Sequence, residues 1–284
     1  MIKHLGSGMI AALGAVALAV PLWADPAQRV VSVGGAVTEI VYALGEEGRL
    51  VARDTTSNFP AAAEALPDVG YIRALSPEGV LSVAPDLILS EEGAGPPEAV
   101  ELLKAAAIPF AEVPDGFTRD AVLAKITAVG DALAVPEKAA ALAEKVGAEL
   151  DAAVAGVVPS GKKVLFILSM QDGRILASGT GTSADGIIRL AGAENAVTAF
   201  EGYKPLTDEA VTEAQPDVIL MMDREGDHAA ANAQLLAHPA ISTTPAAANQ
   251  AIVRMDGMLL LGFSIRTPEA VRDLAAALNG TGGH

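Results

Sequence analysis

The sequence predicts an α/β fold in which two doubly wound α/β lobes are joined by a long backbone helix, with a ligand cleft between the lobes. Short apolar runs alternate with alanine-rich helical stretches along most of the chain. The alternation stops once, at a helical region from residue 118 to about 157. A segment of the first half also recurs in the second half.

The alternation favours parallel sheets that are covered by helices on both faces. Between the apolar runs, stretches such as 97–107 and 184–190 carry apolar residues at helical spacing. The predicted strands span 29–33, 50–53, 86–89 and 109–113 in the first half, and 164–168, 217–221 and 251–255 in the second.

The helical region contains no strand-like run and is broken near Pro136. We therefore predict an N-terminal lobe over 25–118, a connecting helical spine over 119–161 and a C-terminal lobe over 162–284. In open α/β sheets ligands bind beyond the carboxyl ends of the strands. The loops that follow the strands are therefore where we look for functional residues.

The first residues have the layout of a cleavable signal peptide. Lys3 precedes an apolar stretch that ends near Leu22, and Ala24 stands before the charged Asp25. The stretch is shorter than the ~20 residues that span a bilayer. We predict removal of residues 1–24 and export to the periplasm. The chain has no cysteine, so we expect neither a lipid-anchored lipoprotein nor disulfides.

Composition excludes several classes of function. The formal net charge of −16 argues against nucleic acid and against anionic lipid, although a few converging arginines could still hold an anionic ligand. The motifs G-x-S-x-G, H-E-x-x-H and the P-loop are absent. His228 and His238, both expected at the surface, cannot build a zinc site by themselves.

The repeated segment reads Gly-Tyr, a short loop, Ser or Thr, a glutamate two residues on, a short helix, and then Pro-Asp before a strand. Ser76 and Thr207 are typical helix N-caps, and Glu78 and Glu209 complement the helix dipole. Capping alone would explain the two glutamates. Their symmetric placement on the two lobes favours an additional role. The two copies span 70–89 and 202–220.

These segments, together with 29–40, resemble the periplasmic binding proteins of ABC importers that have a long helical backbone and serve haem, cobalamin and siderophores. Within that family the runs 70–82, 179–185 and 256–263 are most similar to the haem-binding branch. The resemblance covers essentially the whole mature chain. It implies that Tyr71 supplies the phenolate that ligates ferric haem iron.

The chemistry around Tyr71 is consistent with that role. A phenolate oxygen suits ferric iron, and nearby positive charge helps to stabilise the anion. Arg73 could supply this charge or bind a propionate, and Arg174 is a candidate for the second propionate. Arg254 and Arg266 are weaker candidates.

One departure from the family pattern concerns the second axial ligand. Many haem-binding relatives carry a histidine in the loop that we place at 168–174, and this chain has none there. Met170 lies in that loop, but its soft thioether is a poor partner for ferric iron. Either the iron is five-coordinate on Tyr71, or Tyr203 contributes from a loop of the second lobe.

The resemblance also implies partners. Glu78 and Glu209 correspond to the glutamates that dock into arginine pockets of a permease dimer in the inner membrane, and an outer-membrane haem receptor system would act upstream. Haem is then the transported ligand and the protein is not an enzyme. Two alternatives are a corrinoid or ferric siderophore on the same scaffold, and a chelatase-like enzyme, for which no metal-accepting histidine is evident in the cleft.

Overall fold

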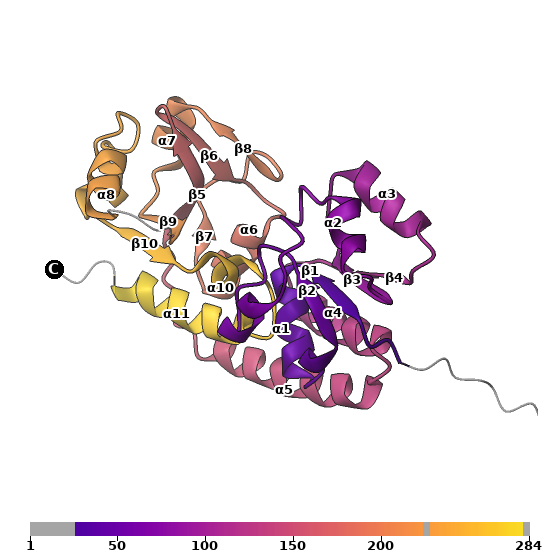
Figure 1. Ribbon diagram of the computed structural model, residues 1–284. Coiled ribbons are helices and arrows are strands. Elements are labelled where there is room, and N and C mark those ends of the chain that lie inside the picture. The colour runs from indigo at the N-terminus through magenta and orange to yellow at the C-terminus, as the bar shows by residue number, and fades with distance from the viewer. Residues whose placement is uncertain (1–25, 224–227, 281–284) are drawn as a thin grey trace, which may run out of the picture.

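The computed structural model describes residues 26–223 and 228–280. Figure 1 shows two α/β lobes side by side, with helix α5 (Pro136–Ala155) beneath them. The predicted fold class is therefore confirmed. The predicted signal peptide lies outside the described residues.

The first lobe contains a parallel sheet of order β2-β1-β3-β4. Its strands start and end within two residues of the predicted runs, because continuous apolar sequence marks strands that are buried on both faces. The strands are β1 (Val30–Val33), β2 (Leu50–Arg53), β3 (Leu87–Glu91) and β4 (Phe110–Val113). The helical segments are α1 (Gly35–Ala43), η1 (Glu47–Arg49), η2 (Ala61–Ala65), α2 (Pro77–Ser82) and α3 (Pro97–Ala105).

The second lobe contains a mixed sheet of order β10-β9-β5-β6-β8, with β7 paired to β5. Strands β5, β9 and β10 are parallel, whereas β6 and β8 are antiparallel to their neighbours. The strands are β5 (Lys163–Gln171), β6 (Arg174–Ser178), β7 (Glu194–Asn195), β8 (Tyr203–Leu206), β9 (Val218–Met222) and β10 (Ile252–Met255). The helices are α6 (Ser183–Leu190), α7 (Asp208–Ala214), α8 (His228–Leu236), α9 (Pro245–Ala248), α10 (Gly257–Leu261) and α11 (Thr267–Gly280).

The predicted loop at 168–174 is wrong. Strand β5 continues to Gln171, which pairs with Arg174 of β6 across the two turn residues Asp172 and Gly173. Both turn residues have positive φ, 50° and 73°. This is the backbone that a two-residue hairpin requires, and Asp-Gly is a strong sequence signal for it.

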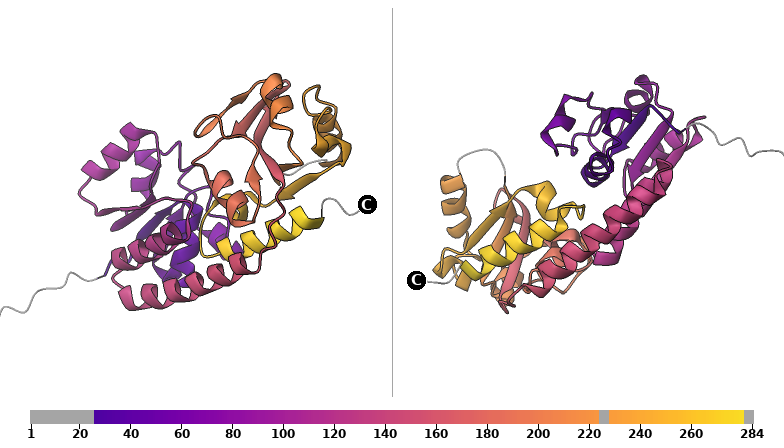
Figure 2. Two further views of the ribbon diagram at one scale, coloured as in Figure 1. Left: turned by 180° about the vertical axis from the view of Figure 1, so that it is seen from behind. Right: turned by 90° about the horizontal axis from the view of Figure 1, so that it is seen from below.

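The helical region between the lobes forms two helices, with the break at Pro136 that the sequence predicts. Helix α4 (Arg119–Ala132) ends before Pro136, and α5 begins there. Helix α4 packs against α1, β4 and α5, whereas α5 packs against α4 and α11. Helix α5 thus contacts the second lobe through α11 and the first lobe through the hydrogen bond from Lys138 to Glu46, and Figure 2 shows it running along both.

One apolar cluster is shared by the two lobes. It runs from the first sheet through α4 and α5 into the second sheet and α11. Its fully buried members include Ile40, Ile126, Phe166 and Leu274. No helix in the described ranges is long and apolar enough to cross a membrane.

The sequence repeat is also a structural repeat. Ser76 and Thr207 each accept a hydrogen bond, at 3.3 Å, from the backbone N–H three residues on, as predicted for N-caps. The carboxylate of Asp86 accepts from the backbone that leads into β1, and that of Asp217 accepts from the first residue of β5. Each Pro-Asp thus fixes the start of one strand beside another.

Candidate ligand-binding site

Tyr71 lies on the loop between β2 and α2, and its side chain is 47% exposed. The loop backbone is fixed: Thr55 N–H donates to Gly70 O at 2.9 Å, and Ala74 N–H donates to Tyr71 O at 2.7 Å. Gly70 has a φ of 102°, which favours glycine at this position. The phenol therefore projects into solvent from an ordered turn.

Further contacts hold the Tyr71 loop on both sides. The carboxylate of Asp68 accepts from Arg53, at 2.8 Å, and from the Gly70 backbone. Ile72 is buried, and its carbonyl accepts from Gly95 N–H at 2.9 Å. Because Ile72 anchors the turn inward, Tyr71 and Arg73 on either side of it are both exposed.

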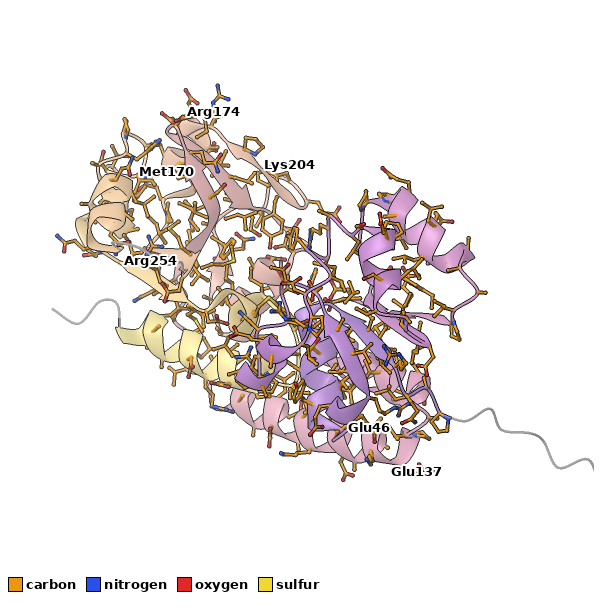
Figure 3. The ribbon with its side chains drawn as sticks, viewed as in Figure 1. Glu46, Glu137, Met170, Arg174, Lys204 and Arg254 are labelled. Atoms are coloured by element: carbon orange, nitrogen blue, oxygen red, sulfur yellow. The ribbon has the colours of Figure 1, made fainter. Side chains whose placement is uncertain are left out.

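The other predicted arginines differ in their surroundings. Arg174 is exposed at the start of β6, and Figure 3 shows it at the outer end of the β5–β6 hairpin. Arg254 donates two hydrogen bonds to Asn232 of α8, and Figure 3 shows it on the α8 side of the second lobe. Arg254 is therefore engaged within its own lobe.

Tyr203 and Met170 are strand residues rather than loop residues. Tyr203 opens β8, where it is half-buried against Phe166 with ring centroids 6.3 Å apart. Its hydroxyl lies 3.3 Å from Ser183 Oγ at the start of α6. Met170 lies in β5 and packs against an apolar cluster that includes Leu235 of α8. Both predictions of a loop position are wrong, because β6 and β8 extend the sheet here.

Glu78 and Glu209 are exposed in the first turns of α2 and α7. Figure 1 shows these two helices on the upper side of the two lobes, opposite α5. Glu209 also borders an open depression. This depression is lined by Asp208, Glu209, Thr212, Glu213, Pro239 and Ala240.

His238 is not the surface residue that the sequence led us to expect. It is buried, Ala240 N–H donates to its Nδ1, and its Nε2 lies 2.8 Å from Gly173 O. This pattern places the ring proton on Nε2, which donates to the hairpin turn. The side chain of His228 lies outside the described part of the chain. Within that part, no group of three His, Cys, Asp or Glu residues could hold a metal ion.

A buried ionic cluster lies at the carboxyl edge of the first sheet, and sequence reasoning missed it. Lys125 of α4 is fully buried, and its ammonium binds Glu91 at the end of β3 and Asp115 Oδ1 at 3.0 Å. Burial raises the pKa of Glu91 against the opposing effect of Lys125. Burial alone would lower the pKa of Lys125, but the two carboxylates outweigh it and the pKa is raised.

An ionic contact also joins the two lobes. Arg266 of the second lobe donates to Glu39 of α1 at 3.0 Å, and Ser264 donates to the other carboxylate oxygen. The guanidinium of Arg266 also lies 3.9 Å from the ring centroid of Phe59 in the first lobe. Burial raises the pKa of Glu39, although Arg266 opposes this. Arg266 thus contacts two groups of the opposite lobe.

Comparison with known proteins identifies the family of this chain. The periplasmic heme-binding protein BhuT, solved in complex with two hemes, is 42% identical with a TM-score of 0.83, over 89% of this chain and 98% of that chain. The vitamin B12-binding protein of Yersinia pestis (strain Pestoides F) is 36% identical over 87 residues, which is 31% of each chain.

A further relative is YvrC of Bacillus subtilis (strain 168), named as an uncharacterized ABC transporter substrate-binding lipoprotein. It is 28% identical over 201 residues, which cover 69% of this chain and 64% of the relative. The chain thus spans less than two thirds of the length of either curated relative. The family profile described as periplasmic binding protein matches residues 30–259, and the chain belongs to that family.

Proposed function

We propose that this periplasmic binding protein captures haem and delivers it to the permease dimer of an ABC importer in the inner membrane. The observation that carries the proposal is the exposed phenol of Tyr71 on an ordered turn, with the exposed Arg73 two residues away. A phenolate oxygen is a suitable axial ligand for ferric iron. The similarity to a heme-binding protein of known structure gives independent support.

The geometry favours five-coordinate iron held by Tyr71 alone. Tyr203 would first have to release its contact with Ser183, and Met170 would have to leave an apolar cluster. Arg73 and Arg174 are exposed and are the proposed contacts of the two haem propionates. Both arginines would neutralise ligand charge in a protein whose overall charge is strongly negative.

A corrinoid is the second candidate ligand, because one relative is a vitamin B12-binding protein. Ferric siderophores are disfavoured by the low aromatic content of 4%. A chelatase-like activity would need a histidine to accept a metal. His238 is the histidine whose side chain the structure describes, and it is buried against the hairpin turn.

An absorption titration with haemin tests the ligand. We expect saturable binding with the spectrum of ferric tyrosinate haem, and a loss of at least about a hundredfold in affinity in Tyr71→Phe because the iron ligand is removed. Tyr42→Phe, a half-buried tyrosine on α1, is the control. Saturable binding that is unaffected by Tyr71→Phe would move the iron ligand elsewhere, and saturable binding of cyanocobalamin alone would favour the corrinoid.

The docking role of Glu78 and Glu209 is a separate part of the proposal. Their exposure on α2 and α7 lets a dimeric permease contact both lobes at once. The predicted lobes, 25–118 and 162–284, would each present one glutamate, with 119–161 between them. In Glu78→Ala plus Glu209→Ala we expect haem uptake to fall while haemin affinity stays unchanged. Unchanged uptake would exclude this docking mode.

Export to the periplasm completes the proposal, with an outer-membrane haem receptor system upstream. A relative is a lipoprotein, whereas this sequence has no cysteine to carry a lipid. We therefore propose that cleavage after Ala24 releases an unanchored protein. N-terminal sequencing of the periplasmic protein should begin at Asp25, and a protein retained with the membrane pellet would contradict this.

A further inference from the structure

Two aromatic side chains in the described part of the chain are exposed, Tyr71 at 47% and Phe59 at 41%. The other aromatic rings described there are buried or half-buried. An exposed phenol keeps a polar group in water, but an exposed phenylalanine ring gains nothing from solvent. An exposed aromatic ring on the loop next to that of the proposed iron ligand is a candidate contact for a flat bound ligand.

Phe59 and Tyr71 lie on adjoining loops. The residues after β2 lead to Phe59, and those before α2 carry Tyr71. The two loops are joined by the ion pair of Arg53 with Asp68 and by the hydrogen bond from Thr55 N–H to Gly70 O. Because β2 ends in the first of these loops, both aromatic residues belong to the carboxyl side of the first sheet, where open α/β sheets bind ligands.

Arg266 fixes the orientation of the Phe59 ring. Its guanidinium lies 3.9 Å from the ring centroid and covers the ring from the second lobe. The arginine is itself held by Glu39, whose side chain is only 2% exposed. Because the stacked cation is anchored, the ring is ordered before any ligand binds, which lowers the entropy cost of binding.

We propose that the exposed part of the Phe59 ring is a stacking surface for a flat tetrapyrrole macrocycle, adjacent to the tyrosine that holds the iron. This inference rests on the proposed function and adds a specificity-determining residue to it. Aromatic rings pack against flat π-systems in offset-stacked or edge-to-face arrangements. A ferric siderophore offers no continuous flat macrocycle of this size.

Metal-free protoporphyrin IX is the probe that isolates this contact, because it has the flat ring but no iron for Tyr71 to ligate. Its fluorescence is titrated into the unmodified protein, Phe59→Ala, Phe59→Leu and Tyr71→Phe. We expect Phe59→Ala to weaken protoporphyrin binding about tenfold, Phe59→Leu to weaken it less, and Tyr71→Phe to change it little. Leu102→Ala, at an exposed leucine of α3, is the matched control.

The haemin titration separates the two proposals. If haemin binds through Tyr71 and protoporphyrin binding is the same in Phe59→Ala as in the unmodified protein, the stacking surface is wrong and the haem proposal stands. If the unmodified protein binds haemin but not protoporphyrin, the stacking proposal is also wrong. If neither compound binds the unmodified protein, both proposals fail. A thermal melt of each variant checks that the substitution leaves the fold intact.

Discussion

The Gly-Tyr dipeptide occurs once in each lobe, and its tyrosine has different surroundings in the two lobes. Both precede a capped helix and a Pro-Asp strand start, yet Tyr71 is exposed on a turn and Tyr203 is half-buried in β8. The second lobe has the additional strands β6 and β8, which give Tyr203 a backbone partner in Ser178. The first lobe has no such strands. The same dipeptide therefore leaves a free phenol in only one lobe.

The buried polar groups at the two sheets also differ. At the carboxyl edge of the first sheet, Lys125 is buried with two carboxylates. In the second lobe, the amide of Asn195 donates to Gly179 O at 3.0 Å and to Asp185 Oδ1 at 3.1 Å. The first lobe thus buries a cation between two carboxylates, whereas in the second lobe a buried carboxylate, Asp185, is paired with the exposed Arg189 and with Asn195.

Removal of the buried cation should give the largest effect. In Lys125→Met we expect the free energy of unfolding to fall by about 3–5 kcal/mol, because Glu91 and Asp115 lose their counter-ion. Lys104→Met, which breaks the exposed pair with Glu112, should cost less than about 1 kcal/mol. Urea unfolding measures both. Equal losses would mean that the buried cluster is no more important than a surface pair.

The Pro-Asp strand starts should differ between the lobes. The Asp86 carboxylate accepts two backbone hydrogen bonds at the first sheet, whereas one is seen for Asp217 at the second. We expect Asp86→Ala to cost about 2 kcal/mol and Asp217→Ala about 1 kcal/mol. The same urea titrations give the two values. A larger loss of stability in Asp217→Ala than in Asp86→Ala would show that the number of backbone hydrogen bonds does not set the contribution of each aspartate.

The two tyrosines should also differ in how much their hydroxyl groups contribute to the free energy of unfolding. Tyr203→Phe removes the contact with Ser183 and should cost about 1 kcal/mol. Tyr71→Phe should change the free energy of unfolding by less than about 0.5 kcal/mol because the hydroxyl is exposed. Chemical denaturation without ligand gives both differences. A clear loss in Tyr71→Phe alone would reverse the assignment of structural and binding roles.

The smallest expected effect is the pH dependence of the contribution that Glu46 makes to stability. The hydrogen bond from Lys138 lowers the pKa of Glu46 below its usual 4.5, and Arg49 lowers it further. The ionised form therefore stabilises the fold above pH 4.5, and this contribution is lost as the pH falls through the lowered pKa. Glu46→Gln should cost about 1 kcal/mol at pH 7 and nearly nothing below that pKa, by urea unfolding across pH. Figure 3 shows Glu46 near the α5 end of the first lobe. Glu47→Gln is the control.

The sequence predicted the features that depend on local pattern. Continuous apolar runs located the four strands of the parallel first sheet and the strands β5, β9 and β10 of the mixed second sheet, and Ser76 and Thr207 were recognised as caps because capping involves residues only three apart. Strand β8 was missed because it contains Pro205, which is typical of an edge strand, and β6 was missed because it follows β5 directly after a two-residue turn. The Asp172-Gly173 pair was the available signal.

The remaining site features depend on contacts between distant residues. Lys125 lies on a helix with a weakly amphipathic pattern, so its sequence gives no sign that it is buried. Phe59 is an ordinary aromatic residue until Arg266, more than 200 positions away, is placed on its ring. Neither the buried cluster nor the joint between the lobes could be inferred from residue spacing.

The apolar cluster shared by the lobes has a consequence for how the protein unfolds. Because Ile40 and Ile126 belong to the same packed unit as Phe166 and Leu274, full opening of one lobe would expose apolar surface of the other. The two lobes should therefore melt in a single cooperative transition, with a calorimetric enthalpy equal to the van't Hoff enthalpy. In architecture the molecule has two lobes, but we expect it to unfold as one domain.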